Sequence, residues 1–128
     1  MATPPAAFNR NQLFDALVQQ ESGGRVGAVG QPTQYGTALG ATQMLPATAK
    51  EMADKLGVPW QPSMLTGKSE AAKQYQLRLG KAYLDQGFSE TGNVRDALHY
   101  YHGGPNRKLW GPKTKRYANE VLARLGVK

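Results

Sequence analysis

The 128-residue sequence contains no cysteine, which excludes disulfide bonds and thiolate metal sites. No apolar run approaches the roughly 20 residues that a membrane-spanning helix needs, so no membrane span is expected. The opening residues MATPPAAF lack the basic and apolar segments of a signal peptide, and we expect a flexible segment over residues 1–8. The chain is long enough to bury a core without cross-links, so residues 1–128 are expected to form a single domain.

Acidic residues are scarce: 9 Asp and Glu stand against 16 Lys and Arg, a formal charge of +7. This excess favours a polyanionic partner, whether nucleic acid, an anionic membrane surface or an acidic cell-envelope polymer. The clearest concentration is a basic cluster without acids, formed by Arg107, Lys108, Lys113, Lys115 and Arg116. It is either a solvated face or a surface that attracts anionic wall polymers. No expected helix carries a dense basic face, which argues against a nucleic-acid partner.

Apolar residues recur at helical spacing in five segments, which predicts five helices around one core. The stripes run over Leu13–Val18, Ala49–Leu56, Ala72–Tyr83, Val94–Tyr101 and Tyr117–Leu125. Residues 23–40 contain six glycines and are too glycine-rich for a helix, so we expect an extended loop or a small β-hairpin there. The predicted fold class is mostly α, with this glycine-rich loop or hairpin as the one non-helical segment of this length.

Several residues indicate where these helices begin and end. Asn9 or Asn11 is suited to cap the first helix, and Ser69 to open the third. Gly87 is expected to end that third helix. Asn93, with an acid three positions later, resembles a capping box for the fourth.

A carboxylate lies on the inward face of the first expected helix. Leu17 and Glu21 follow Phe14 at i+3 and i+7, so Glu21 shares the face that packs inward. Burial and the negative end of the helix dipole both disfavour the ionised form, and we hypothesise a raised pKa suited to a general acid. The alternative is a solvated end residue neutralised by Arg25. The next carboxylate along the chain is Glu51.

Three ordered motifs carry a family resemblance: ESGG at 21–24, GATQMLPATA at 40–49 and ALHYYHGGP at 97–105. They resemble the Glu-Ser, Gly-Leu-Met-Gln with Met-Pro-x-Thr-Ala, and Ala-Tyr-Asn-x-Gly-Pro motifs of the soluble lytic transglycosylase family. The closing segment TKRYANEVL is similar to that family's Tyr-x-x-x-Val-Leu. Each motif alone is weak, but three in order are specific. The resemblance implies a lysozyme-like α+β fold.

The resemblance also implies a reaction. Glu21 takes the role of the family's single catalytic acid/base, which cleaves the bond between N-acetylmuramic acid (MurNAc) and N-acetylglucosamine (GlcNAc) in peptidoglycan. The C6 hydroxyl of MurNAc then closes a 1,6-anhydro ring. Neither a cofactor nor a second carboxylate is required, which agrees with the acid-free segment after Glu21.

Five further side chains match substrate-binding positions of the family motifs: Ser22, Gln43, Leu45, Tyr101 and Tyr117. Each has a structural alternative. Ser22 is suited equally to securing the helix end, and Gln43 to tying its loop. Leu45 replaces the usual Met as an apolar wall, and helical spacing alone places both tyrosines in the core.

The sequence departs from the family pattern at two places. His102 replaces Asn, which brings a group that titrates near neutrality to the cleft, unless it only caps its helix. Ala41 and Thr42 replace Leu-Met and make one wall smaller and more polar. His99 and His102 have a spacing that suits a metal pair, but with no Cys and only Asp96 nearby we expect no metal.

Three rival functions remain at this point. The first is a muramidase on the same fold, in which water replaces the C6 hydroxyl. The second is a non-catalytic wall-binding module, and the third is a basic helical nucleic-acid binder, which the charge permits. For either enzyme we expect a monomer whose partner is the peptidoglycan glycan strand, acting in the periplasm or outside the cell. Without a signal peptide, a phage virion protein, a phage lysin or an excised domain is expected.

Overall fold

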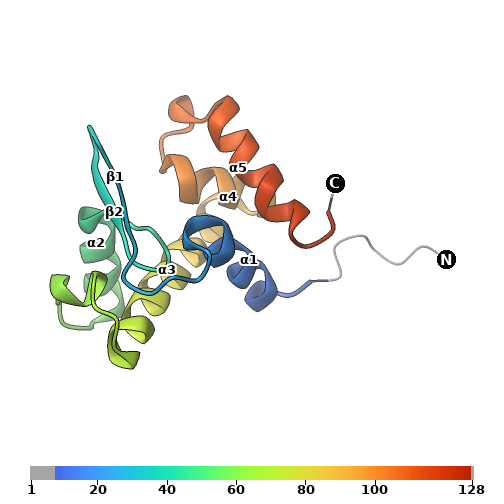
Figure 1. The fold of residues 1–128 in the computed structure, drawn as a ribbon. Helices are drawn as coiled ribbons and strands as arrows, with labels where there is room; N and C mark the ends of the chain where they lie inside the picture. Colours follow the sequence, from blue (N-terminus) through green and yellow to red (C-terminus); the bar gives the residue numbers. More distant parts are fainter. Residues whose placement is uncertain (1–7, 128) are drawn as a thin grey trace. The chain divides into compact units, whose positions relative to one another are not determined.

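The computed structural model describes residues 8–127, which contain five α-helices, two short 3-10 helices and one β-hairpin (Figure 1). In chain order the elements are α1 (Arg10–Ser22), β1 (Val29–Thr33), β2 (Gly36–Leu39), α2 (Pro46–Leu56), η1 (Pro62–Leu65), α3 (Glu70–Thr91), α4 (Val94–Gly103), η2 (Arg107–Leu109) and α5 (Pro112–Ala123). The predicted mostly helical fold with a small hairpin is confirmed. The expected flexible segment over residues 1–8 lies outside the described residues, except for Phe8.

The described chain divides into two compact units. The first unit consists of residues 8–20 and 84–127, and the second unit of residues 21–83. The expectation of one domain over residues 1–128 stays a prediction.

In the first unit, α4 packs against α5 through the stripes that the sequence predicts. The buried apolar side chains of these two helices are Ala97, Leu98, Tyr100, Tyr101, Tyr117, Ala118, Val121 and Leu122. Asn9 caps α1: its Oδ1 accepts from the Gln12 amide at 2.8 Å, and its own amide donates to Gln12 Oε1 at 2.8 Å. The predicted cap at Asn93 is also present, because its Oδ1 accepts from the Asp96 amide at 2.8 Å. Local capping chemistry therefore sets where these helices begin.

The expectation that Gly87 ends the third helix is wrong. Helix α3 continues to Thr91, and Gly92 follows it with a φ of 81°. Gly87 is buried inside the helix, where an added Cβ would lie 3.2 Å from both the Ala97 carbonyl oxygen and Tyr100 Cδ1. The missing side chain thus allows α4 to approach α3 closely.

In the second unit, β1 and β2 pair antiparallel, with Thr33 opposite Gly36 at the turn, and β2 contacts α2. Pro46 occupies the first position of α2, where its missing N–H costs nothing. The inner face of α2 is buried as expected at Ala49, Met52 and Ala53, whereas Leu56, the last residue of the helix, is exposed.

One buried amide holds the loops of the second unit on α3. Gln76 is 1% exposed, and its Oε1 accepts hydrogen bonds from the backbone amides of Gly27 (3.0 Å) and Ala41 (2.8 Å). Its Nε2 donates to the carbonyl oxygens of Met64 (2.8 Å) and Gly67 (2.9 Å). A carboxamide can make four such bonds, so its capacity is filled. Loop segments before and after α2 are thereby tied to one side chain.

We predict that Gln76→Leu lowers the free energy of unfolding by about 3–5 kcal/mol. Two backbone amides and two carbonyl groups lose their buried partners, at a cost of about 1–3 kcal/mol each, and water that reaches some of these groups reduces the total. Urea denaturation measures this. The matched control is Gln74→Leu on the exposed face of α3, where the Gln74 amide bonds only Glu70 across one turn. Equal losses in the two variants would contradict the role assigned to Gln76.

Candidate active site

The carboxylate singled out in the sequence lies in the last turn of α1. Glu21 is partly buried, and the Ser22 side chain beside it is buried. The Ser22 hydroxyl donates to the Ala41 carbonyl oxygen at 2.7 Å and accepts from the Gly24 amide at 3.1 Å. Ser22 thus secures the end of α1 to the segment that carries the second motif, which is the structural alternative considered for it.

Two of the three residues that depart from the family pattern are packed inside this segment. Ala41 and Thr42 are both buried, and Thr42 Oγ1 donates to the Gln76 carbonyl oxygen at 3.2 Å. The Thr42 side chain lies against Gly80 of α3, where an added Cβ would be 2.4 Å from Thr42 Cγ2. Threonine at this position therefore packs on α3 and depends on a glycine there.

Gln43 is the one non-glycine residue with positive φ among those the structure describes, at 52°. Such a conformation costs about 1–2 kcal/mol and persists where surrounding bonds hold it. Here the Gln43 Nε2 donates to the carbonyl oxygens of Ala28 (3.2 Å) and Gly40 (3.0 Å). Both side-chain N–H groups are occupied, and Oε1 lies against Gly30, 2.6 Å from where a Cβ on that residue would be.

Leu45 immediately precedes α2 and is half-buried. Its Cδ2 lies beside the hairpin turn, 3.7 Å from where a Cβ on Gly36 would be. Glu21, Ser22, Gln43 and Leu45 therefore belong to the second unit, on the end of α1 and on the segment between β2 and α2.

The other three predicted side chains belong to the first unit. Tyr101 on α4 and Tyr117 on α5 are 7% and 5% exposed, as their helical spacing predicts. The His102 ring stacks on the Tyr117 ring, with centroids 4.4 Å apart and an interplanar angle of 16°. The packing of α4 on α5 thus brings His102 and Tyr117 together.

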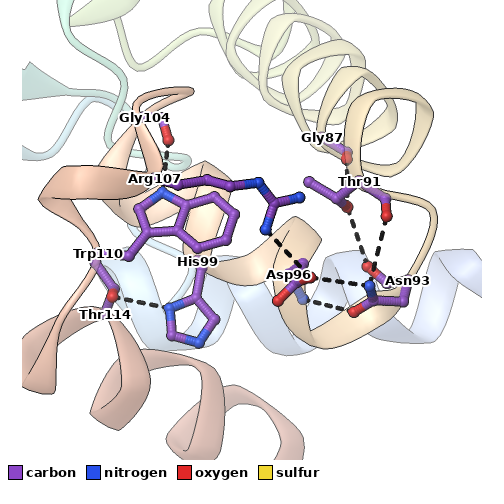
Figure 2. A network of polar contacts seen from close by, with 9 residues as sticks. All are labelled: Gly87, Thr91, Asn93, Asp96, His99, Gly104, Arg107, Trp110 and Thr114. Carbon is purple, nitrogen blue, oxygen red and sulfur yellow. Dashed lines mark hydrogen bonds and ion pairs between the residues drawn. The ribbon is translucent and has the colours of Figure 1, made fainter.

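A polar network fixes the start of α4 (Figure 2). The Asn93 Nδ2 donates to Asp96 Oδ2 at 3.0 Å, and the Arg107 guanidinium lies 3.5 Å from the same carboxylate oxygen. The hydrogen bond from Asn93 is the largest influence on the pKa of Asp96 and lowers it, and the Arg107 guanidinium lowers it further. Asp96 therefore stays ionised and holds η2 to the first turn of α4.

The same network continues through aromatic rings toward α5. Figure 2 shows Arg107 and His99 against the Trp110 ring, whose centroid is 4.6 Å from the guanidinium and 5.1 Å from the imidazole. His99 Nδ1 lies 2.8 Å from Thr114 Oγ1, and Trp110 Nε1 donates to the Gly104 carbonyl oxygen at 2.8 Å. These contacts hold the connection between α4 and α5, and with it the helix that carries Tyr101 and His102.

Within residues 8–127, no three His, Cys, Asp or Glu side chains converge as metal ligands would. None of the helices described is both long and apolar enough to cross a membrane.

With this geometry in place, comparison with known proteins identifies the family. The family model described as "Transglycosylase SLT domain" matches residues 7–122. The chain belongs to the transglycosylase SLT domain family. The expected membership of the lytic transglycosylases is thereby confirmed, and with it the expectation of an enzyme domain.

Two relatives of this SLT domain support the assignment. A transglycosylase of Enterobacteria phage PRD1 is 32% identical over 117 residues, which cover 91% of this chain and 37% of the phage protein. The X-ray structure of the lytic transglycosylase Slt from Pseudomonas aeruginosa, solved as an inactive mutant, matches with a TM-score of 0.65 and 27% identity, over 90% of this chain and 21% of that one. The lysozyme-like, mostly helical fold is confirmed. The chain spans only about a third of the phage relative and a fifth of the bacterial one.

His102 replaces the asparagine of the SLT motif and has an altered proton affinity. The residue is exposed as a whole, but its ring packs on Tyr117, and this burial lowers the pKa of His102 below its usual 6.5. The nearby Lys113 ammonium lowers it further. The imidazole is therefore neutral at neutral pH and can accept as well as donate a hydrogen bond, as an asparagine can.

We predict that an NMR titration of the His102 ring gives a pKa below 6.5, and that Tyr117→Leu raises it toward that value by exposing the ring. The folded state binds this proton less readily than the unfolded chain does. The contribution of His102 to the free energy of unfolding is therefore fully present above pH 6.5. It is lost as the pH falls from 6.5 through the pKa of the folded state. A pKa at or above 6.5 would contradict the packing described.

Gln76 was not among the residues predicted from the sequence, although a signal for it exists. Gln76 lies four residues after Ala72 and three before Leu79, on the apolar stripe of α3. A polar residue inside such a stripe must find partners when it is buried. Gly80 was missed as well, because a glycine that admits a neighbouring segment has no local pattern.

Proposed function

We propose that this domain is a peptidoglycan lytic transglycosylase that cleaves the MurNAc-β-1,4-GlcNAc bond and leaves 1,6-anhydro-MurNAc, with Glu21 as the only general acid/base. The observation that carries the proposal is the SLT family match across residues 7–122, with Glu21 and Ser22 at the end of α1. The Pseudomonas enzyme is inactive as a mutant in which glutamine replaces one glutamate, which agrees with dependence on a single glutamate.

The burial and pairing of the acids in the second unit support the role of Glu21. Residues 21–83 are all described, and they contain three other acids: Glu51, Asp54 and Glu70. All three are exposed and contact a neighbour one turn away on their own helix: Glu51 contacts Lys55 at 3.7 Å, Asp54 contacts Lys50 at 3.1 Å, and Glu70 accepts from Gln74 at 2.8 Å. Glu21 is the only acid of this unit that is partly buried.

The proposed reaction needs one carboxyl group used twice. Protonated Glu21 gives its proton to the glycosidic oxygen, and the bond between this oxygen and C1 of MurNAc breaks. The substrate's own N-acetyl group stabilises C1 meanwhile. The Glu21 carboxylate then takes the proton of the MurNAc C6 hydroxyl, whose oxygen forms the new bond to C1. The proton returns to Glu21 and no water is consumed.

The remaining predicted residues receive separate roles in this proposal. Ser22 positions Glu21 through its bond to the Ala41 carbonyl, and Gln43 offers Oε1 as an acceptor to a sugar hydroxyl. Leu45 provides an apolar wall. For Tyr101, His102 and Tyr117 we propose the substrate-contacting role that the family motifs imply, through their hydroxyl and imidazole groups.

We expect Glu21→Gln to reduce lysis of purified peptidoglycan by at least about 100-fold, since general acid–base catalysis contributes about 10²–10⁴-fold. Turbidity measures the rate, and circular dichroism verifies the fold. The matched control is Glu51→Gln, an exposed acid of the same unit, which should retain full activity. Undiminished lysis by Glu21→Gln would contradict the assignment of Glu21 as the general acid/base and favour a different catalytic group.

We further propose that the domain acts on the wall from the periplasm or the cell exterior as a monomer, and that a phage virion protein or lysin is its setting, in line with the phage relative. The basic cluster supplies attraction to anionic wall polymers. Arg107 pairs with Asp96, but Lys108, Lys113, Lys115 and Arg116 form no ion pair within residues 8–127.

The double variant Lys115→Glu with Arg116→Glu should bind teichoic-acid-containing walls about 3- to 10-fold more weakly at low salt. The difference should vanish near about 0.5 M salt, where surface charges are screened. Co-sedimentation measures this binding. Lys68→Glu with Lys73→Glu makes the same charge change at exposed positions of the other unit. Equal weakening by both pairs would mean that net charge alone, and not the basic cluster, attracts the wall.

A further inference from the structure

The hairpin of the second unit is a neutral, partly apolar surface on a strongly basic protein. Residues 26–49 contain no charged side chain, although the chain carries a formal charge of +7. Tyr35 at the hairpin turn is 65% exposed, as is Val29 at the base of β1. Gln31 and Gln34 are exposed beside them. A single exposed aromatic side chain is common, but this one belongs to an uncharged segment that also carries two exposed carboxamides.

The turn holds the backbone of Tyr35 in a defined position. Thr33 pairs with Gly36 and leaves Gln34 and Tyr35 as a two-residue loop. The Thr33 hydroxyl accepts from the Tyr35 amide at 3.1 Å and donates to the Gly36 carbonyl oxygen at 2.8 Å. Gly36 follows this loop with a φ of 117°, a conformation that favours glycine. Fixing the backbone in advance reduces the entropy that a ligand contact must overcome.

The hairpin also lies next to two side chains, Gln43 and Leu45, for which a substrate contact is proposed above. At its base, the Gln43 amide donates to the Ala28 carbonyl oxygen at 3.2 Å. At its turn, Leu45 Cδ2 lies 3.7 Å from where a Cβ on Gly36, the residue after Tyr35, would be. Gln43, Leu45 and Tyr35 therefore lie along one connected part of the second unit.

We propose that the Tyr35 ring, with the neighbouring amides of the turn, is an outer binding surface for the sugar rings of the glycan strand. The inference takes its ligand class from the proposed function. The C–H face of a pyranose ring packs on an aromatic ring, and its hydroxyl groups exchange hydrogen bonds with carboxamides. The sugar rings of the strand backbone are uncharged, which fits a surface without charges. Tyr35 positions the strand and takes no part in bond cleavage.

The test is an NMR titration of the full Glu21→Gln chain with a soluble GlcNAc oligosaccharide. We expect amide shifts at residues 33–37. Tyr35→Ala should weaken binding about 3- to 10-fold, the range that a single aromatic contact contributes. Tyr35→Phe keeps the ring and should stay within about 2-fold of the parent. Leu109→Ala, which truncates an exposed apolar residue of the first unit, serves as the control and should not change binding.

The inference is overturned if the hairpin amides do not shift, or if Tyr35→Ala binds as tightly as the parent. Concentration-dependent self-association that Tyr35→Ala abolishes would also overturn it, by assigning the surface to a second copy of the chain. Wall cleavage by the unmutated chain, assayed separately, reports on the proposed function. Oligosaccharide binding through Tyr35 without any wall cleavage would therefore refute the proposed function. It would still support the proposal that Tyr35 forms a sugar-binding surface.

Discussion

The arrangement of the second unit depends on one buried carboxamide. Gln76 binds the amides of Gly27 and Ala41 on one side and two carbonyl groups of the connection after α2 on the other. Ala41 in turn accepts the hydroxyl hydrogen bond of Ser22, the residue next to Glu21. A continuous chain of hydrogen bonds therefore runs from the middle of α3 to the end of α1. Buried polar groups tolerate few alternative partners, so these bonds specify where the loop lies.

The long uncharged segment and the basic cluster belong to different units of the protein. In the second unit, residues 26–49, which follow Glu21 in the sequence, carry no charge, and we propose that they offer a ligand only hydrogen bonds and apolar contacts. The basic cluster belongs to the first unit, on and before α5. In our proposals, long-range attraction to a polyanion and short-range recognition of sugar rings therefore rest on different side chains. Added salt should therefore weaken the attraction to the polyanion and leave the recognition of sugar rings intact.

Much of the fold could be predicted from sequence because periodicity, capping residues and prolines mark helices locally. The ordered motifs also located Glu21, which periodicity alone placed only on an inward face. What remained hidden depends on tertiary contacts. Gly87 looked like a helix end because a glycine that admits a neighbouring helix has the same local sequence as a terminator. The positive φ of Gln43 and the stack of His102 on Tyr117 require partners distant in sequence.

The central claim is that the MurNAc C6 hydroxyl, and not water, completes the cleavage that Glu21 begins. Mass spectrometry of peptidoglycan digested in heavy-oxygen water tests it most directly. The account predicts fragments that end in 1,6-anhydro-MurNAc, lighter by one water than hydrolysed fragments and free of solvent oxygen. Fragments with reducing ends that carry the heavy oxygen would contradict it and show that the domain is a muramidase.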